Sequence, residues 1–291
     1  MSAESVPSKD KENDMAFPVA KNRILTDQER DGHIAALHAL FKTKTRFEFR
    51  KVIERAQELS AMLRPDDVVV DVARNYPYGG TSIFGPLFTH AQYVPIDSPL
   101  ENADERVGYL KELVPEAGGY IGIPSVAKGK IDARVPMPDN SADYYLILNI
   151  VEHVKDPAGM LAECRRILKP GGTAIVYAPN VREEHQVPCD YFRYTRYGFV
   201  HLATQAGLTV KHTEPVSGVF DVVGMALQHA IGYFPEGQER EEMTRFVMEE
   251  MMPKLEGWEK RFCSSIGEND TTVPVPDRKE FPVAYLFTLR K

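Results

Sequence analysis

The stretch that decides the fold is YYLILNIVEHVKDPAGMLAECRRILKPGGTAIVYAPN, residues 144–180. It opens with an apolar run typical of a buried strand, continues with a segment of helical period over residues 157–168, and closes with a second apolar run at 173–178. The KPGG sequence at 169–172 carries Lys, Pro and Gly in the order expected of a helix stop. A strand, a helix and a strand in succession indicate one unit of a parallel sheet.

The same alternation continues on both sides of this block. Two segments of helical composition, residues 103–113 and 197–206, lie between apolar runs of strand length. The expected strands are residues 67–72, 92–96, 120–123, 144–150, 173–178, 208–212 and 282–289. This order predicts an α/β fold with a doubly wound, Rossmann-like, mainly parallel seven-stranded sheet.

Composition and periodicity divide the chain into four parts. Residues 1–22 are polar and charged and predict a disordered N-terminal tail, whereas residues 23–64 carry two apolar patterns of helical period, which predict N-terminal cap helices. The sheet domain is expected over residues 65–219 and 273–291, with a helical lid insertion at 220–272 before the last strand. Met and aromatic residues are frequent in this insertion, which favours either a lid over the active site or a homodimer surface.

Bulk composition excludes several kinds of protein. The formal net charge of -7 and the pI near 5.7 argue against nucleic acid as a partner. The polar N-terminus and the lack of a long apolar run predict no membrane partner and a cytoplasmic location. The three cysteines show no CxxC pattern and no histidine at zinc-ligand spacing, so free thiols are expected and no metal-ligand set is recognised.

Two short motifs within the opening block indicate which family the sequence resembles. A strand ending near Asn149 is followed by Glu152-His153, and the helix after this pair is followed by LKPGG and a further strand. In this order and spacing the block resembles the class I S-adenosylmethionine-dependent methyltransferase superfamily, in particular its methyltransferase type 11-like branch. The resemblance covers roughly residues 65–215, together with the last strand, and implies S-adenosylmethionine as the cofactor.

The resemblance also implies which residues hold this cofactor. Asp97, followed by Ser98, corresponds to the acidic residue that accepts hydrogen bonds from both ribose hydroxyls. Asp132 and Ala133 correspond to the residues that hold the adenine, and Asn149 to the residue that faces the methionine end. Two alternatives stay open: a solvated turn at Asp97, and a surface ion pair between Asp132 and a neighbouring basic residue.

The loop DVARNYPYGG, residues 71–80, departs from the Gly-x-Gly-x-Gly pattern of that family. The turn follows the first strand, where backbone passes close to the methionine carboxylate, and Asn tolerates positive φ better than most residues. The cofactor-binding candidates in it are Asp71, Ala73, Asn75, Tyr76 and Tyr78. The two tyrosines either hold the sulfonium cation through their aromatic faces or pack beneath the cap helices.

A second block, EEHQVPCDYFRYTRYGF at residues 183–199, follows the fifth strand and should overhang the cofactor. It resembles the methyltransferase branch often encoded with sugar and polysaccharide biosynthesis. The candidates for substrate contact are His185, Asp190, Tyr191, Arg193 and Tyr194. His185 is the candidate general base, because its unperturbed pKa lies near neutrality. The alternative is a structural ion pair between Asp190 and Arg193, with Thr195 capping the next helix.

Two further residues are candidates for the reaction. Tyr177, at the end of the fifth strand, is expected to point at the same space as His185. His153 is either catalytic or a hydrogen-bonded histidine behind the site, and Glu152-His153 are expected to cap the following helix and brace the loop. The catalytic candidates are therefore His185, Tyr177, Tyr191, Arg193 and His153.

These features favour an enzyme that transfers a methyl group to a hydroxyl or amine of a small-molecule or sugar substrate. Catalysis would come from alignment of the acceptor with the methyl group and from removal of the acceptor's proton. Two alternatives stay open. One is altered chemistry on the same cofactor, such as cyclisation of the aminobutyrate chain or another alkyl transfer that releases methylthioadenosine. The other is a non-catalytic protein that keeps the fold.

Overall fold

Helices and strands alternate along the chain in the computed structural model, which describes residues 26–43, 48–74, 84–88, 90–98, 127–128, 135, 137–185, 190–263 and 281–291. The helices are α1 (Asp27–Thr43), α2 (Glu48–Met62), α4 (Pro157–Ile167), α5 (Arg196–Gln205), α6 (Val219–Ile231), α7 (Gln238–Arg245) and α8 (Met252–Phe262). Short helical turns are η1 (Gly85–Phe88), η3 (Val151–His153) and the π-helical η4 (Phe246–Met251). The strands are β1 (Val68–Arg74), β2 (Gln92–Ser98), β3 (Ala127–Lys128), β4 (Ala142–Leu148), β5 (Leu168–Pro179), β6 (Thr209–Val216) and β7 (Ala284–Arg290).

The strands form one sheet in the order β3-β2-β1-β4-β5-β7-β6. The first five of these pair in parallel, and β7 lies antiparallel between β5 and β6. Since β6 is also antiparallel to β7, it runs in the same direction as β5. The predicted mainly parallel α/β sheet is confirmed, with six longer strands and the two-residue β3.

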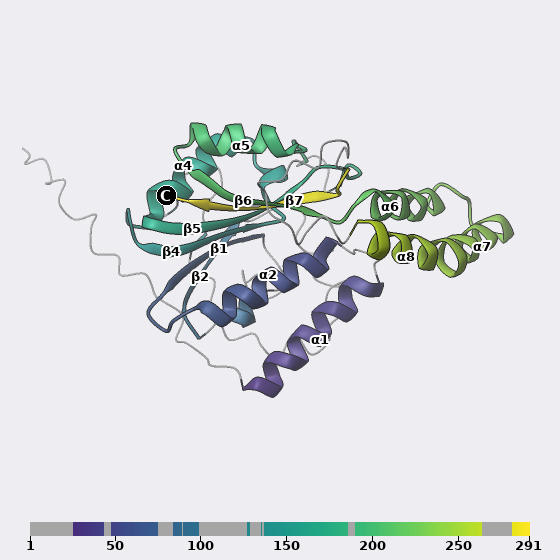
Figure 1. The fold of residues 1–291 in the computed structure, drawn as a ribbon, viewed down its shortest axis with the longest axis horizontal. Helices are drawn as coiled ribbons and strands as arrows, with labels where there is room; N and C mark the ends of the chain where they lie inside the picture. The colour runs from purple at the N-terminus through teal and green to yellow at the C-terminus, as the bar shows by residue number, and fades with distance from the viewer. Residues whose placement is uncertain are drawn as a thin grey trace, which may run out of the picture.

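Helices cover both faces of the sheet (Figure 1). Because successive residues of a strand point to opposite faces, each strand contributes to two cores. Tyr145 and Val176 belong to the core shared with α4 and α5. Leu146 and Ile175 belong to the core shared with α1 and α2, the two helices that lie where N-terminal helices are predicted. With both faces covered, the edge at the strand ends is the place left for a ligand.

The observed elements lie close to the predicted ones, with two informative differences. β5 begins at Leu168, so the KPGG sequence at 169–172 lies within the strand and not in a loop between helix and strand. Gly171 there has a φ of 77°, which only glycine adopts readily. β1 runs to Arg74, beyond its predicted end. Outside the described residues lie the predicted strand at 120–123 and the predicted helix at 103–113.

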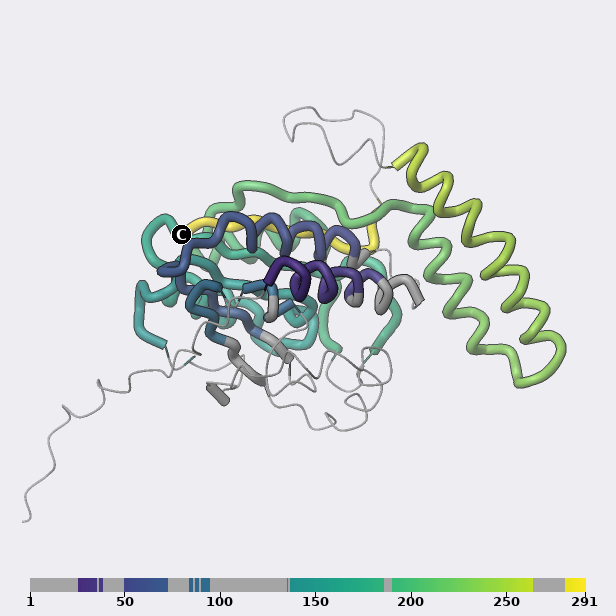
Figure 2. The backbone as a smooth tube through the Cα atoms, turned by 90° about the horizontal axis from the view of Figure 1, so that it is seen from below, coloured from purple at the N-terminus to yellow at the C-terminus, as the bar shows by residue number. Residues whose placement is uncertain are grey.

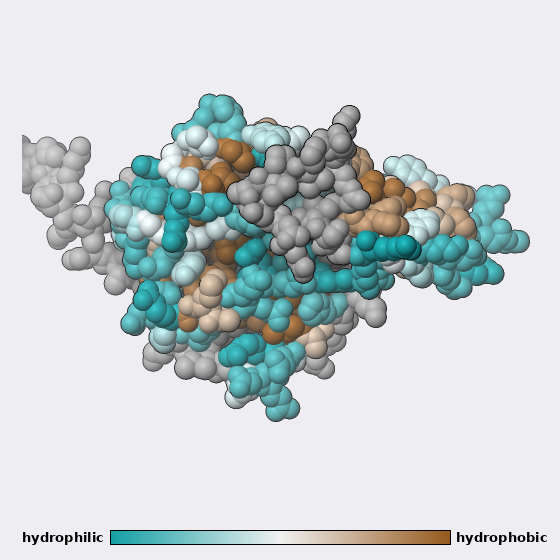
Figure 3. Space-filling view, viewed as in Figure 1, coloured by the Kyte–Doolittle hydropathy of each residue, from teal (hydrophilic) through white to brown (hydrophobic). Residues whose placement is uncertain are grey.

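A helical arm, residues 219–263, precedes the last strand. β6 ends at the same edge as β5, and the chain continues from there into α6, α7, η4 and α8, which project from the sheet (Figures 1 and 2). Val247, Met252 and Leu255 form a small core inside the arm. Apolar residues also gather on the surface where the arm leaves the sheet (Figure 3). The exposed fractions of Tyr233 (80%) and Trp258 (41%) show that its helices do not bury all their large side chains.

Two expectations from composition can be compared with these residues. In the part of the chain that the structure describes, no helix is both long and apolar enough to cross a membrane. Cys164 and Cys263 are free thiols. Cys189 lies outside the described residues.

Candidate functional site

The carboxyl ends of β1, β2 and β4 meet at one edge of the sheet, where doubly wound folds bind ligands. Ala73 in β1 lies in register with Asp97 in β2, and Arg74 lies in register with Ser98. Asn149 follows directly after β4, on the other side of β1. The structure thus brings four predicted ligand-binding positions, three of them placed by backbone register, to the ends of neighbouring strands.

Asp71 lies deeper in the sheet than predicted. The predicted strand ends at residue 72, but β1 continues to Arg74, and the Asp71 side chain is fully buried. Its Oδ2 accepts a hydrogen bond of 2.7 Å from the hydroxyl of Tyr93, a residue of the core beneath α1 and α2. Asp71 therefore links β1 to β2 below the edge of the sheet. A contact between Asp71 and a ligand stays a prediction.

Asn149 has a backbone conformation that is uncommon for residues other than glycine. Its φ is 58°, in the left-handed region. Its side-chain Oδ1 is buried and accepts no hydrogen bond from any residue in the described ranges. A buried amide oxygen in that state costs free energy unless another group bonds to it, and unusual backbone conformations cluster at functional sites. Asn149 is therefore suited to contact a bound ligand.

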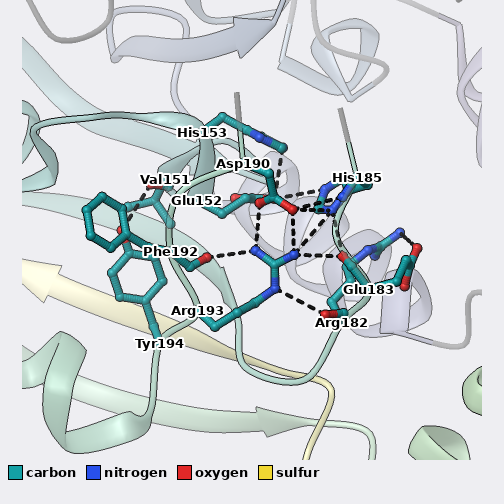
Figure 4. Close-up of polar contacts among 10 residues, drawn as sticks. All are labelled: Val151, Glu152, His153, Arg182, Glu183, His185, Asp190, Phe192, Arg193 and Tyr194. Carbon is teal, nitrogen blue, oxygen red and sulfur yellow. Dashed lines mark hydrogen bonds and ion pairs between the residues drawn. The ribbon is translucent and has the colours of Figure 1, made fainter. Parts of the chain in front are cut away.

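The segment after β5 folds back onto the turn after β4. The carbonyl oxygen of Glu152 accepts hydrogen bonds from the backbone N–H groups of Tyr191 (2.9 Å) and Phe192 (3.2 Å). The hydroxyl of Tyr194 donates to the carbonyl oxygen of Val151 at 3.0 Å. These bonds hold two segments that are far apart in the sequence against each other, and Figure 4 shows the one from Tyr194 to Val151. The prediction that Glu152 braces this loop is thereby confirmed.

Two helix caps can also be compared with the predictions. Asp156 caps the N-terminus of α4, and its side chain accepts a hydrogen bond of 2.9 Å from the backbone of the first turn. The expectation that Glu152 and His153 cap this helix is wrong, because both lie in η3, before the cap. Thr195 caps the N-terminus of α5, and its hydroxyl accepts a hydrogen bond of 3.2 Å from the first turn, as the alternative interpretation predicts.

Glu152, His153 and His185 converge between η3 and the segment after β5 (Figure 4). Oε1 of Glu152 lies 3.4 Å from Nε2 of His153 and 3.8 Å from Nε2 of His185. The two imidazole rings meet edge to face, with their centroids 4.8 Å apart. The side chains of His153 and Glu152 are only 2% and 3% exposed. Two predicted catalytic histidines thus surround one buried carboxylate.

Asp190 and Arg193 form the ion pair that the sequence offers as the alternative to substrate contact. The guanidinium Nη1 and Nη2 each donate to one carboxylate oxygen at 2.7 Å, a two-pronged geometry. Nη2 also donates to the carbonyl oxygen of Glu183 at 2.7 Å. Burial raises the pKa of Asp190, but hydrogen bonds from Arg193 and from the His185 backbone outweigh it, so that the pKa lies well below its usual range. Arg193 is therefore occupied in holding this loop.

His185 is uncharged at neutral pH. Burial, followed by the positive charge of Arg182, lowers its pKa from 6.5 to about 4. The carbonyl of Glu183 and the carboxylate of Asp190 act in the opposite direction and are outweighed. The imidazole thus has a lone pair to offer, but with so low a pKa it is a weak proton acceptor. This electrostatic setting suits a ligand-binding histidine better than a general base.

The other reaction candidates lie at separate places. Tyr177 is 1% exposed and packs with Val216 and Leu286 in the core beneath α1 and α2. The prediction instead has its side chain facing the substrate. Tyr191 is half-buried, and the ammonium group of Lys155 lies 5.7 Å from its ring centroid. Outside the described residues lie the ligand-binding candidates Asn75, Tyr76, Tyr78, Asp132 and Ala133. Their roles stay predictions.

Sequence reasoning missed the position of the Glu152 carboxylate between two histidines. The signal for it is present: Glu152 and His153 follow β4, and His185 follows β5. Since β4 and β5 are neighbouring parallel strands, residues that follow them emerge at the same edge. Arg182, which lowers the pKa of His185, gives no such signal, because a basic residue in a loop is most often solvated.

Comparison with known proteins shows which proteins this chain is similar to. A family model described as "Methyltransferase domain" matches residues 99–176. The chain is 30% identical over 97 residues to a "Probable S-adenosylmethionine-dependent methyltransferase" from Mycolicibacterium smegmatis, covering 32% of this chain and 38% of that protein. It is 28% identical over 148 residues to an uncharacterized 37.1 kDa transposon protein from Streptomyces fradiae, covering 39% and 43%. The chain thus spans less than half the length of these relatives.

Among solved structures, the chain is similar to a SAM-dependent methyltransferase from Archaeoglobus fulgidus. The sequence identity is 15% and the TM-score is 0.46, and the match covers 87% of this chain and 98% of that one. The matched family model confirms the resemblance inferred from the motifs around residues 149–172.

Proposed function

We propose, on the premise that the chain carries a class I S-adenosylmethionine-dependent methyltransferase domain, that it transfers a methyl group to a hydroxyl or amine of a small molecule or sugar. The observation that carries this proposal is the edge where β1, β2 and β4 end. Asp97 lies there opposite Ala73, and Asn149 follows the strand on the other side. These are the positions at which the family binds the ribose and the methionine end of its cofactor.

The residues present fit such a cofactor. A carboxylate at the end of β2 can accept hydrogen bonds from both ribose hydroxyls. The buried Oδ1 of Asn149, which has no partner in the described part of the chain, can accept one from the methionine ammonium group. By analogy with the matched family, Asp132 and Ala133 of this chain would hold the adenine. S-adenosylmethionine supplies an electrophilic methyl group, so the protein's part is to align the acceptor and to exclude water.

The acceptor would bind between η3 and the segment that folds back over it. Tyr191 and Phe192 lie on this segment and remain partly exposed, while their backbone is fixed to Glu152. The arm begins at the same edge of the sheet, so residues 219–263 would act either as a lid over the acceptor or as a homodimer surface. Because the proposed acceptor is a small molecule, the proposal includes a role in cytoplasmic biosynthesis, with no nucleic acid or membrane as partner.

One observation keeps a second chemistry open. The loop at residues 71–80 replaces the glycines of the family with Ala73, Asn75 and bulky tyrosines, at the place where the methionine end would lie. A reshaped pocket there could favour attack within the aminobutyrate chain, with release of methylthioadenosine. The third alternative is a protein that keeps the fold without catalysis.

Product analysis separates these alternatives. The purified protein is incubated with S-adenosylmethionine, first alone and then with pools of small hydroxyl and amine compounds, and the products are identified by mass spectrometry. Methyl transfer predicts S-adenosylhomocysteine that accumulates only when an acceptor is present. Methylthioadenosine formed without an acceptor would instead establish the second chemistry. Lack of cofactor binding would contradict both.

A further inference from the structure

The strongest unassigned feature is the group formed by Glu152, His153 and His185. One ligand atom from each lies within 4.8 Å of the other two. Two ligands bound at about 2.0–2.1 Å to a tetrahedral ion lie about 3.3–3.4 Å apart. The distances from Oε1 of Glu152 to the two Nε2 atoms, 3.4 and 3.8 Å, are close to that separation. The glutamate oxygen is thus spaced from each histidine nitrogen approximately as two ligands of one ion are.

The hydrogen bonds around His185 fix which ring nitrogen is free to bind. Nδ1 lies 3.2 Å from the carbonyl oxygen of Glu183 and 3.3 Å from Oδ2 of Asp190. Nη2 of Arg193 lies 3.4 Å from the same nitrogen, but its two hydrogens are directed to those same oxygens at 2.7 Å. Nδ1 therefore carries the hydrogen and donates it, which leaves the lone pair on Nε2.

That lone pair faces a carboxylate. Nε2 of His185 and Oε1 of Glu152 are 3.8 Å apart, and both are electron-rich, so one cation could bind to both atoms. Asp190 lies on the Nδ1 side of the imidazole. A carboxylate in this position is common where a histidine binds a metal, since it fixes the tautomer and raises the basicity of the ligand. Arg193 in turn fixes Asp190.

Carboxylates accompany the two guanidinium groups that lie near this cluster. Arg182 lies 3.6 Å from Glu183, and Arg193 is paired with Asp190. The Glu152 side chain, which carries the carboxylate of the cluster, is 3% exposed. A buried carboxylate between two imidazoles is stabilised strongly by a divalent ion.

We propose that Glu152, His153 and His185 bind one divalent first-row transition-metal ion, with Zn²⁺ as the reference ion. Two histidines and one glutamate are a donor set that suits Zn²⁺ and leaves at least one coordination position open. Asp190 is a positioning residue that holds His185 through Nδ1. The ligands come from two segments, which the parallel pairing of β4 and β5 brings to the same edge of the sheet.

The site lies where an acceptor would be activated, a role that rests on the proposed function. An acceptor hydroxyl bound at the open position would have a lowered pKa and would release its proton to solvent. The resulting alkoxide oxygen would form the new O–CH₃ bond. The C–S bond of the sulfonium would break, with its electron pair returning to sulfur.

The test uses the full, tag-free chain after treatment with a chelator, titrated with CoCl₂ and followed by visible absorption, and separately with ZnCl₂ by calorimetry. We expect one equivalent of each ion to bind, with d–d absorption typical of low-coordinate Co²⁺. His185→Ala should abolish this absorption at micromolar Co²⁺. Asp190→Asn should weaken binding by about 10- to 100-fold, the usual effect of losing a group behind a ligand.

His201→Ala is the matched control, because His201 is exposed on α5 and should leave binding unchanged. Circular dichroism and thermal unfolding check that each variant folds, and His185→Gln replaces His185→Ala if the latter does not. Lack of Co²⁺ absorption in the wild type, or equal affinity in the wild type and a folded His185 variant, would overturn the proposal. S-adenosylmethionine is not present in this titration, so its outcome is separate from that of the proposed function.

Discussion

Arg193 decides whether Asp190 is a paired or an isolated buried carboxylate. The Asp190 side chain is 4% exposed, and Arg193 supplies two of its hydrogen bonds. Arg193→Ala should therefore lower the free energy of unfolding by about 2 kcal/mol, less than the roughly 3–5 kcal/mol for fully buried pairs, because the Arg193 side chain is 25% exposed. Urea unfolding measures this change. Arg245→Ala, at an exposed position on α7, should change it by no more than about 0.5 kcal/mol, and an equal loss in both variants would contradict this account.

The thiol of Cys263 should react slowly at neutral pH. Burial, followed by the negative charge of Glu259, raises its pKa to about 11. Only the thiolate reacts with iodoacetamide, so the labelling rate should keep rising with pH up to about 11 and lie roughly 100-fold below that of an ordinary cysteine near pH 8. Peptide-resolved mass spectrometry measures this rate. Glu259→Gln should lower the pKa and speed labelling, whereas a rate that levels off near pH 9 would refute the shift.

Phe287 joins two elements, the strand β7 and the helix α5. It is fully buried, and its ring stacks on that of Phe199 with centroids 4.3 Å apart. Phe287→Ala should cost about 3–5 kcal/mol of unfolding free energy, because it leaves a cavity between the sheet and the helix. Phe281→Ala provides the control, since Phe281 is 50% exposed just before the same strand. Similar midpoints of urea unfolding for both variants would show that β7 is not anchored in this way.

Sequence reasoning placed most of these elements because their patterns are local. The helix α4 and the strand before it follow from apolar periodicity, and Thr195 caps α5 as its residue type suggests. The KPGG sequence was misplaced because pairing with β4 extends β5 back to Leu168, an effect of tertiary contacts that no local pattern reports. The end of β1 was set too early for the same reason, since Ala73 and Arg74 pair with β2.

The site could be predicted only in part, because it depends on the whole molecule. Asn149 was found from its place after a strand, but its left-handed backbone is a property of the fold. The grouping of Glu152 with His153 and His185 requires the order of β4 and β5 and the return of residues 190–194 onto η3. Spacing along one segment, which is how metal sites are usually recognised, does not contain this information.

Binding of S-adenosylmethionine to the whole protein tests the central claim most directly. Calorimetric titration should show one site, and saturating cofactor should raise the unfolding temperature because it binds only the folded state. Asp97→Asn should weaken binding by about 10- to 100-fold, through loss of charged hydrogen bonds worth about 1.5–3 kcal/mol. Asp66→Asn, at the other end of β1, is the matched control and should bind as the wild type does. A wild-type protein that shows neither binding heat nor a shift in unfolding temperature would contradict the account.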